Sequence, residues 1–454
     1  MTGPGKRPRF SIVTAVYDVE PYLPDFIASI EAQRVPAADL EVVAVDDGST
    51  DGSLDLLLDW ARRSRLRVKV FTKPNGGQGS ARNLGLTHAT GEWVNFADPD
   101  DMLDPDFLRV AARFAAANPE VEIMAGKPIS LIESVGRIAD NHPRRHQYRR
   151  GNRVANLLDE PNVFSGSATV SLFRLDRVRG MDLRFDPRIR PNFEDGHFAI
   201  HYLLALDVPR VGLLRDARYL YRRRAAGTST LQGSLAHPGR FTDVLEHGYN
   251  EVLDAATALH GSIPAWLQQV IVYELSWYLS ADEKITSDIV LADELVPRFH
   301  ELMARIVSRL EPDVVAAHRV RKLRVVWADI LAHGYREETW HMPFVVRGKL
   351  DREMGLRRLG YRFVGAQPDE RFVVDGVEVA PAFAKTRAHR YYGRVLIDER
   401  IIWIPWGTTI QVFLDGVETM TRHRWAPRFG RRGRRALAER LPIYRRLPLP
   451  FFVA

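Results

Sequence analysis

Short apolar runs alternate with helical patterns over the first 225 residues of the 454-residue chain. Four of these runs are rich in β-branched and aromatic residues and stop at turn residues, which is typical of buried strands. Strands that are apolar on both faces and alternate with helices predict an α/β domain built on a parallel sheet. The predicted strands are 10–17, 40–47, 67–73 and 92–98, and the predicted helices are 23–33, 53–63, 79–89 and 105–117.

The pattern changes beyond about residue 235. Apolar positions at helical spacing predict four helices, with prolines near their starts or bends. These helices are 241–260, 265–281, 292–310 and 313–332. From about 344 to 426 the pattern predicts strands instead, with Asp-Gly hairpin turns in 371–379 and 411–419 and a strand pair over 394–406.

We therefore expect four parts in the chain. They are an α/β domain (1–235), a helical linker domain (236–340), a β-rich accessory domain (341–426) and a basic, aromatic tail (427–454).

Composition places the chain among globular proteins, since 45% of residues are apolar and 27% are charged. Without cysteine it has no disulfide, thiolate metal site or Cys nucleophile, which fits a reducing compartment. The first residues lack the apolar region of a signal peptide, and no apolar run approaches the ~20 residues of a membrane span. We expect a cytoplasmic protein, soluble or peripheral at the inner face of the cell membrane.

The net charge of +7 is concentrated near the C-terminus. Residues 421–446 contain ten arginines and one glutamate, which gives this segment a net charge of +9. The rest of the chain then has a net charge of −2. Aromatic residues are interspersed among these arginines. Such a segment suits an anionic membrane surface, a nucleic acid or plain solvent.

Acidic residues follow the fourth predicted strand in the sequence FADPDD. Asp98, Asp100 and Asp101 lie within four positions. One interpretation is a turn and helix N-cap, because Asp104-Pro105 and a helix follow. The other is a divalent cation, since Mg²⁺ and Mn²⁺ take oxygen ligands from one or two carboxylates together with substrate phosphates.

The ends of the other strands carry polar groups as well, and in parallel sheets ligands bind at this edge. VDDGSTDGS places Asp47 just past the second strand, where a carboxylate can accept hydrogen bonds from a base or a ribose. KPNGGQGSARNLG leads into a helix and carries Asn75, Gly79 and Arg82. A glycine-rich turn at a helix N-terminus and an arginine both suit phosphate.

A second acidic site lies in PNFEDGHF, with Glu194 and Asp195 at a predicted helix start. They could cap the helix or act in catalysis. His197 and His201 share a helix face and could bind a metal, but no third ligand matches them.

These motifs resemble the inverting family 2 glycosyltransferases, which have a GT-A fold, over about residues 8–230. The resemblance implies a metal motif at Asp98 and Asp100, a base- and ribose-contacting Asp47, a phosphate-side Arg82 and a general base at Asp195, supported by Glu194. The first strand ends in AVYD, where Ala15 and Asp18 replace the usual Pro and Asn. That segment, with Ala15 and Tyr17, is expected to contact the nucleotide mainly through its backbone.

The segment YLYRRRAAGTST resembles the part of the family that closes over the donor. It makes Arg222, Arg224 and Ser229 candidates for phosphate or acceptor contact, and the alternative is an edge strand with a solvated basic loop.

The resemblance implies a Mn²⁺- or Mg²⁺-dependent hexosyltransferase that uses a nucleotide-diphospho-sugar and a polysaccharide, teichoic-acid or lipid-linked acceptor. The order of the three domains is similar to that of teichoic-acid-modifying transferases. For such an enzyme we favour the membrane surface over nucleic acid as the partner of the tail; self-association stays open. The alternatives are a polyol-phosphate or nucleotidyl transferase with a similar nucleotide site, and a non-catalytic polysaccharide-binding protein.

Overall fold

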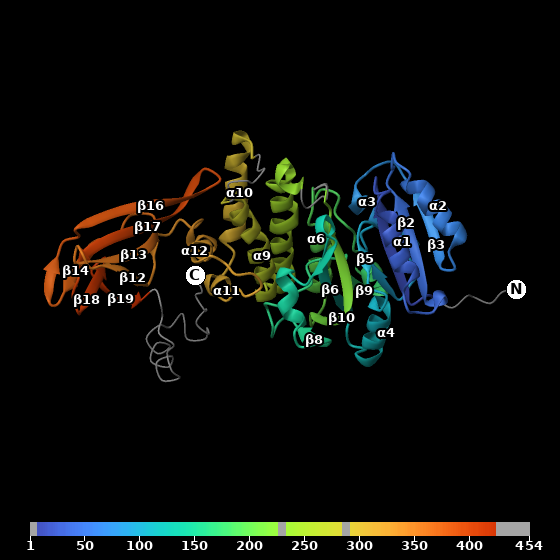
Figure 1. The fold of residues 1–454 in the computed structure, drawn as a ribbon, viewed down its shortest axis with the longest axis horizontal. Coiled ribbons are helices and arrows are strands. Elements are labelled where there is room, and N and C mark those ends of the chain that lie inside the picture. Colours follow the sequence, from blue (N-terminus) through green and yellow to red (C-terminus); the bar gives the residue numbers. More distant parts are fainter. Residues whose placement is uncertain (1–6, 226–232, 284–290, 424–454) are drawn as a thin grey trace. The chain divides into compact units, whose positions relative to one another are not determined.

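The computed structural model describes residues 7–225, 233–283 and 291–423 (Figure 1). The chain divides into two compact units. The first comprises Met1–Glu274, Asp288–Leu302 and Arg319–Lys322, and the second comprises Leu275–Ser287, Met303–His318 and Leu323–Ala454.

The first unit is built on a mixed sheet with strand order β3-β2-β1-β4-β9-β6-β10-β5. The four predicted strands are present and parallel: β1 (Phe10–Val16), β2 (Leu40–Asp46), β3 (Arg67–Thr72) and β4 (Trp93–Asn95). The parallel arrangement predicted for these four strands is confirmed, and beyond them, where no strand was predicted, the sheet is mixed. β9 (Ser171–Arg174) runs antiparallel to both β4 and β6 (Ile123–Ile132), because the alternation of strand and helix that enforces parallel pairing ends after residue 117.

The remaining strands of this sheet come from the middle of the chain. β10 pairs with β6 in parallel and with β8 and β5 in antiparallel fashion. Their bounds are β5 (Met102–Leu103), β7 (Arg137–Ala139), β8 (Arg153–Asn156) and β10 (Arg210–Arg223).

The helices that follow the first strands pack on the sheet through one apolar face each. In α1 (Leu23–Glu31) the buried residues are Leu23, Phe26 and Ile30, at helical spacing. Phe26 meets Trp60 of the next helix edge to face, with ring centroids 6.3 Å apart. Full burial of such a side chain contributes about 1.5–3 kcal/mol. The other helices are α2 (Ser53–Arg63), α3 (Gln78–His88), α4 (Phe107–Ala117), α5 (Leu175–Gly180) and α6 (Glu194–Leu204).

Helices dominate residues 234–333, as predicted, and contribute to both units. A π-helical segment, η6 (Val244–Asn250), precedes α8 (Glu251–His260), and α9 (Ala265–Asp282) and α10 (Val296–Val307) follow. The single helix predicted over 313–332 is wrong: α11 (Pro312–Ala316) and α12 (Val325–His333) are separate. The intervening HRVRKLR carries four basic side chains, which repel one another when wound into one helix.

Short 3₁₀ segments complete the helical inventory of the described residues: η1 (Ala37–Asp39), η2 (Glu133–Val135), η3 (Pro143–Tyr148), η4 (Ser234–Ala236), η5 (Pro238–Arg240) and η7 (Asp293–Leu295). Among the described helices, none combines the length and apolar character that crossing a membrane requires.

The second unit contains a sheet with strand order β15-β14-β18-β19-β12-β13-β17-β16. Both predicted hairpins are confirmed, with Asp375-Gly376 and Asp415-Gly416 at positive φ in two-residue turns. The strands are β11 (Trp340–His341), β12 (Phe344–Asp351), β13 (Leu356–Val364), β14 (Glu370–Val374), β15 (Val377–Val379), β16 (Phe383–Tyr391), β17 (Arg394–Pro405), β18 (Ile410–Leu414) and β19 (Val417–His423).

The strand pair predicted over 394–406 is wrong, because β17 is one continuous strand. Its polar centre looks like a turn in the sequence. In the structure Glu399 pairs with Arg387 on the neighbouring strand β16, and Arg400 pairs with Glu370 on β14, which is not adjacent to β17 in the sheet order. Cross-strand ion pairs therefore keep this polar stretch within the sheet.

Candidate functional site

Asp47 follows β2 and is 1% exposed. Its carboxylate accepts hydrogen bonds from the backbone N–H groups of Gly76 (3.1 Å) and Gly77 (2.7 Å) and from Lys73 Nζ (2.6 Å). The glycine-rich turn is therefore folded around Asp47, which holds the end of β2 against the start of α3. Asn75, also in this turn, is exposed.

Gly79 lies in the first turn of α3 and is buried. A Cβ atom at this position would lie 3.3 Å from Phe185 Cβ and 3.8 Å from Glu194 Cγ. A side chain there would push α3 away from the segment that carries the second acidic site. Gly79 thus permits the close approach of two regions that are far apart in sequence.

Arg82 of α3 is 1% exposed and lies between two carboxylates. Its Nη2 is 2.6 Å from Asp98 Oδ1 and its Nη1 is 2.7 Å from Glu194 Oε1. Burial alone would lower the pKa of Arg82, but the charges of Asp98, Glu194 and Asp195 raise it above its ordinary value. The guanidinium joins the two acidic sites that the sequence showed separately.

Asp98, Asp100 and Asp101 form one cluster just past β4. Each offers a carboxylate oxygen, and the three oxygens lie within 4.8 Å of one another. Burial raises the pKa of Asp98 to about 7, with Arg82 opposing the shift and Asp100 adding to it. Three hard oxygen donors at this spacing fit Mg²⁺ or Mn²⁺. The sequence pointed to Asp98 and Asp100 as ligands, and the structure brings Asp101 to them.

Two arginines at the end of β10 reach the same cluster. Arg224 Nε donates to Asp100 Oδ2 at 2.8 Å, and Arg222 Nε donates to the backbone oxygen of Asp100 at 2.7 Å. Arg222 also pairs with Asp25 and Glu133 and is buried, so its charge is already compensated. Both predicted arginines thus contact the cluster, Arg224 through the carboxylate of Asp100 and Arg222 through its backbone oxygen. The predicted Ser229 lies outside the described residues.

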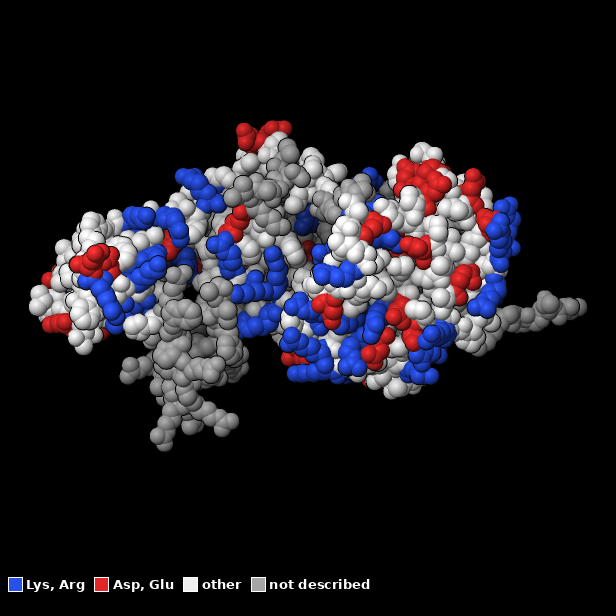
Figure 2. Space-filling model, in the orientation of Figure 1, with Lys and Arg blue, Asp and Glu red and all other residues white. Residues whose placement is uncertain are grey.

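Two residues of the first strand complete the predicted nucleotide site. Ala15 lies near the end of β1 and is half-buried, and Tyr17 just beyond it is 46% exposed. Both lie at the carboxyl edge of the sheet, beside β2, which ends at Asp46. Figure 2 shows acidic side chains gathered above α2 and α3 in this view.

Asp195 lies in the first turn of α6 and is half-buried. Among the described residues, its side chain accepts one hydrogen bond, from the N–H of Gly196 at 2.8 Å. Its charge contributes to the raised pKa values of Asp98 and Glu274, so it acts on groups of both α9 and the metal cluster. Glu194 is buried and bound to Arg82 and Gln78. Asp195 is therefore the carboxylate that stays available.

The start of α6 is fixed by Phe193, whose backbone is left-handed with φ 86°. Its ring packs 4.6 Å from that of Tyr249, and Cβ atoms at Gly196 and Gly248 would lie 2.7 and 3.0 Å from it. The two glycines make room for the ring between α6 and the π-helical segment.

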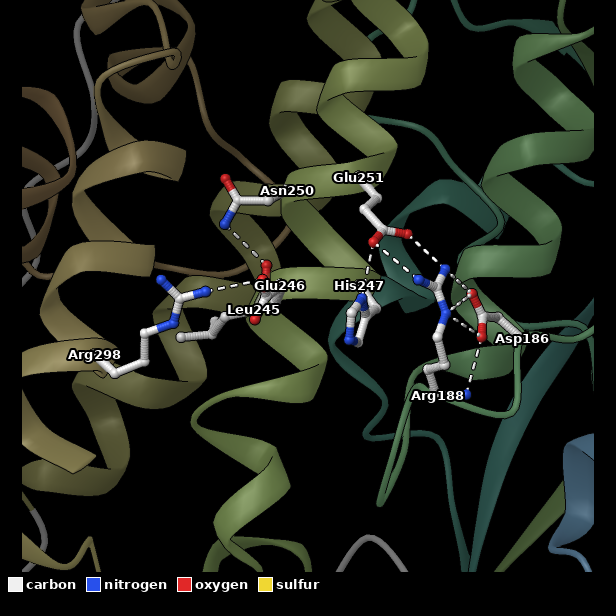
Figure 3. Close-up of polar contacts among 8 residues, drawn as sticks. All are labelled: Asp186, Arg188, Leu245, Glu246, His247, Asn250, Glu251 and Arg298. Carbon is white, nitrogen blue, oxygen red and sulfur yellow. Dashed lines mark hydrogen bonds and ion pairs between the residues drawn. The ribbon is translucent and has the colours of Figure 1, made fainter. Parts of the chain in front are cut away.

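The loop before α6 is tied on both sides, a feature that sequence reasoning missed. Arg188 Nη2 lies 2.6 Å from Asp186 and 2.7 Å from Glu251, and Glu251 also meets His247 at 2.8 Å (Figure 3). Arg190 donates to the backbone oxygen of Gly76 at 2.9 Å. The only sequence signal was the proline-bounded DPRIRPNFED, which gives no partner for either arginine.

His197 and His201 do not form a metal site. Their rings lie 4.3 Å apart, and the one group of metal-ligating residues found among the described residues is the Asp98 cluster. Burial lowers the pKa of His197 to about 3. These histidines belong to the packing of α6.

The mixed sheet and the acidic cluster at the carboxyl edge of its parallel strands are the features of a GT-A fold. Residues 11–179, which are less than half of the chain, match the family model "Glycosyl transferase family 2".

Several curated proteins are similar to this chain. The minor teichoic acid biosynthesis protein GgaB of Bacillus subtilis is 27% identical over 307 residues, which cover 67% of this chain and 33% of GgaB. The poly(ribitol-phosphate) beta-N-acetylglucosaminyltransferase TarS of Staphylococcus aureus is 26% identical over 401 residues, 86% of this chain and 64% of TarS. The chain thus spans about a third of GgaB and somewhat under two thirds of TarS.

Solved structures support the fold. S. aureus TarS 1–349 in complex with UDP-GlcNAc matches with a TM-score of 0.53 and 22% identity, covering 68% of this chain and 84% of that one. The longer TarS structure also reaches 0.53, with 15% identity over 93% of this chain and 79% of TarS. The predicted GT-A fold with a β-rich C-terminal part is confirmed.

Proposed function

We propose that the protein is an inverting, metal-dependent hexosyltransferase that moves a sugar from a nucleotide-diphospho-sugar to a cell-wall polymer of the teichoic-acid type. The main support for this proposal is that Arg82 links the Asp98 cluster to the start of α6, where the carboxylate of Asp195 is available to accept a proton. Arg82 thereby connects the acidic cluster, which lies within the residues that match the family 2 model, to the region of Asp195, which follows those residues in the chain.

The donor would bind at the carboxyl edge of the sheet, in the domain we propose for residues 1–235. Asp47 and the backbone of Ala15 and Tyr17 would meet the nucleoside, and Asn75 and Gly79 would lie at the glycine-rich turn. Asp100, assisted by Asp98, would hold Mn²⁺ or Mg²⁺. A bound divalent ion neutralises the charge of the departing diphosphate.

Asp195 would serve as the general base. As the acceptor oxygen forms a bond to the anomeric carbon, the bond from that carbon to the diphosphate breaks, and the acceptor proton passes to the carboxylate of Asp195. Arg224, which already contacts Asp100, would shift toward the diphosphate as negative charge develops there. Arg82 and Glu194 would keep their present partners and hold Asp195 in place.

The names of the relatives suggest the acceptor. GgaB is a minor teichoic acid biosynthesis protein and TarS acts on poly(ribitol-phosphate). We therefore propose a phosphodiester-linked polyol chain as the acceptor, reached at the inner face of the cell membrane through the basic tail.

One panel experiment tests the proposal. The protein is incubated with Mn²⁺ and UDP-, GDP-, CDP- or dTDP-sugars, with and without a ribitol-phosphate oligomer, and the released nucleotide is identified. We expect nucleoside diphosphate from one donor, dependent on metal and lost in Asp100→Asn. Nucleoside monophosphate or pyrophosphate would point to polyol-phosphate or nucleotidyl transfer, and no release from any donor would favour a non-catalytic binding protein.

A further inference from the structure

Arg144 is a buried arginine outside the donor site. It lies in η3, between β7 and β8, and is 8% exposed. Its guanidinium carbon lies 5.7 Å from the ring centroid of Phe164. Within the described part of the chain, the guanidinium donates no hydrogen bond, although it carries five N–H donors. None of its guanidinium nitrogens is a fully enclosed atom without a partner, so these donors stay open to water or to a ligand. A cation whose side chain is packed in place while its donors stay open suits an anionic ligand.

Arg144 lies close to the start of α6. A Cβ atom at Gly166 would be 3.9 Å from Arg144 Nη1, and the backbone oxygen of Gly166 is 3.2 Å from where a Cβ at Gly196 would lie. Gly196 directly follows Asp195. The backbone of Gly166 thus lies between the guanidinium of Arg144 and Gly196, the residue after the proposed base.

Electrostatic effects place the two groups in the same region. Burial raises the pKa of Glu274; the charges of Arg240 and Arg144 oppose that shift and the charge of Asp195 adds to it. Arg144 and Asp195 therefore both act on the half-buried carboxyl group of Glu274.

The surroundings of Arg144 are basic. Burial lowers the pKa of His142 to about 3, and Arg144, Arg223 and Arg145 contribute to the lowering. On the donor side, in contrast, Arg82 and Arg224 are already bound to carboxylates. Arg144 has no ion pair with a carboxylate within the described part of the chain, so its charge can be compensated by an added anion.

We infer that Arg144 binds a phosphodiester of the acceptor and so presents a neighbouring hydroxyl to Asp195. In a polyol phosphate, the phosphate and the free hydroxyls share one short carbon chain, so fixing the phosphate selects the hydroxyl that reacts. The inference rests on the proposed function and names the acceptor chemistry of the same site.

A binding experiment without donor tests the subsite directly. A ribitol-phosphate trimer and free ribitol are titrated calorimetrically into full-length wild-type protein, Arg144→Gln and Arg144→Lys. The matched control is Arg149→Gln. Arg149 is exposed and lies five positions after Arg144, and its substitution changes the net charge by the same amount. We expect Arg144→Gln to weaken trimer binding at least about tenfold, Arg144→Lys to recover part of it, and the control to stay near wild type.

Kinetic measurements then show whether Arg144 binds the phosphodiester of the acceptor or the diphosphate of the sugar nucleotide. Arg144→Gln should raise KM for the trimer while the affinity for the sugar nucleotide stays unchanged. A parallel loss of donor affinity would assign Arg144 to the donor and overturn the inference. Equal affinity of the wild-type protein for the trimer and for free ribitol would also overturn the inference. If wild-type protein transfers no sugar to any acceptor, the proposed function fails, yet the titration still decides the subsite. Arg144→Lys keeps the test valid if Arg144→Gln does not fold.

Discussion

Arg82 illustrates how one buried side chain can organise a site. It is enclosed and bound to carboxylates of two distant segments, so its removal leaves the buried Glu194 and the partly exposed Asp98 without their compensating charge. Breaking a buried pair in this way typically costs about 3–5 kcal/mol. We predict that Arg82→Met lowers the free energy of unfolding by about that amount in urea titrations.

The control is Arg34→Met. Arg34 pairs with Asp106, but its side chain is 65% exposed, so its loss should cost only about 0–1 kcal/mol. Equal destabilisation by the two variants would show that Arg82 does not act as the buried link.

The proposed base makes a kinetic prediction. Asp195→Asn keeps size and one hydrogen-bonding oxygen but cannot accept the acceptor proton, so kcat should fall by ~10²- to 10⁴-fold. Donor affinity, measured by calorimetry, should stay near wild type because Asp195 acts on the acceptor. Glu194→Gln instead weakens the contact with Arg82 and should lower stability. Normal turnover in Asp195→Asn, or a defect confined to donor binding, would place the base elsewhere.

His197 gives α6 a pH-dependent stability. Burial lowers its pKa to about 3 in the folded protein, below the ordinary value of 6.5. The neutral form therefore stabilises the fold fully above pH 6.5, and this contribution is lost as pH falls toward 3. Between pH 6.5 and 5 the loss should reach about 2 kcal/mol.

Urea unfolding at several pH values checks this. His197→Gln stays neutral throughout, so its stability should fall less between pH 6.5 and 5 than that of the wild type. Identical pH dependence would mean that another group, such as the half-buried His142, whose pKa is also lowered, carries the whole effect.

At the scale of elements, the loop before α6 and the helix α8 are joined by Arg188 (Figure 3). The Arg188 side chain is 53% exposed, so the ion pair itself adds little stability. Its effect should appear in positioning, because small displacements of a catalytic group lower rates by up to about 10²-fold. We predict that Arg188→Gln lowers kcat with little change in melting temperature or donor affinity.

A double-mutant cycle with Glu251→Gln sharpens this prediction. If the two residues act as a pair, the double variant should be no slower than either single one. Arg62→Gln, an exposed arginine on α2, is the control for a general loss of charge. Additive losses in the cycle would indicate that Arg188 acts through Asp186 and not through Glu251.

The elements also show which information the sequence contains. Apolar periodicity located the first four strands and both Asp-Gly hairpins, because these depend on neighbouring residues. Apolar periodicity failed for β17 and for the break between α11 and α12, because charged side chains determine the secondary structure there. Motif spacing placed Asp98, Asp100 and Asp195 at element ends. It could not pair Arg82 with Glu194, 112 positions away, since such contacts exist only once the sheet has formed.

At the scale of the whole molecule, each unit has its own apolar core. One centres on residues such as Phe10, Ile12 and Phe26, and the other on residues such as Val345, Ile402 and Val412. The proposed catalytic groups all lie in the first unit, and Figure 2 shows both basic and acidic side chains on the face of the second unit that it draws. The strongest single-sign charge in the sequence therefore lies beyond β19, outside the described residues.

This distribution predicts that surface attachment and catalysis are separable. A chain ending at His423 retains β19 and loses nine arginines and one glutamate. Basic residues near an anionic membrane contribute roughly 1 kcal/mol each, so the shortened chain should lose salt-sensitive binding to vesicles of anionic lipid in sedimentation assays. It should keep its turnover on a soluble acceptor. A full-length variant with the same nine arginines changed to glutamine separates charge from length, because it should behave like the shortened chain. If the unaltered protein ignores anionic vesicles at low salt, the tail has no role at the membrane.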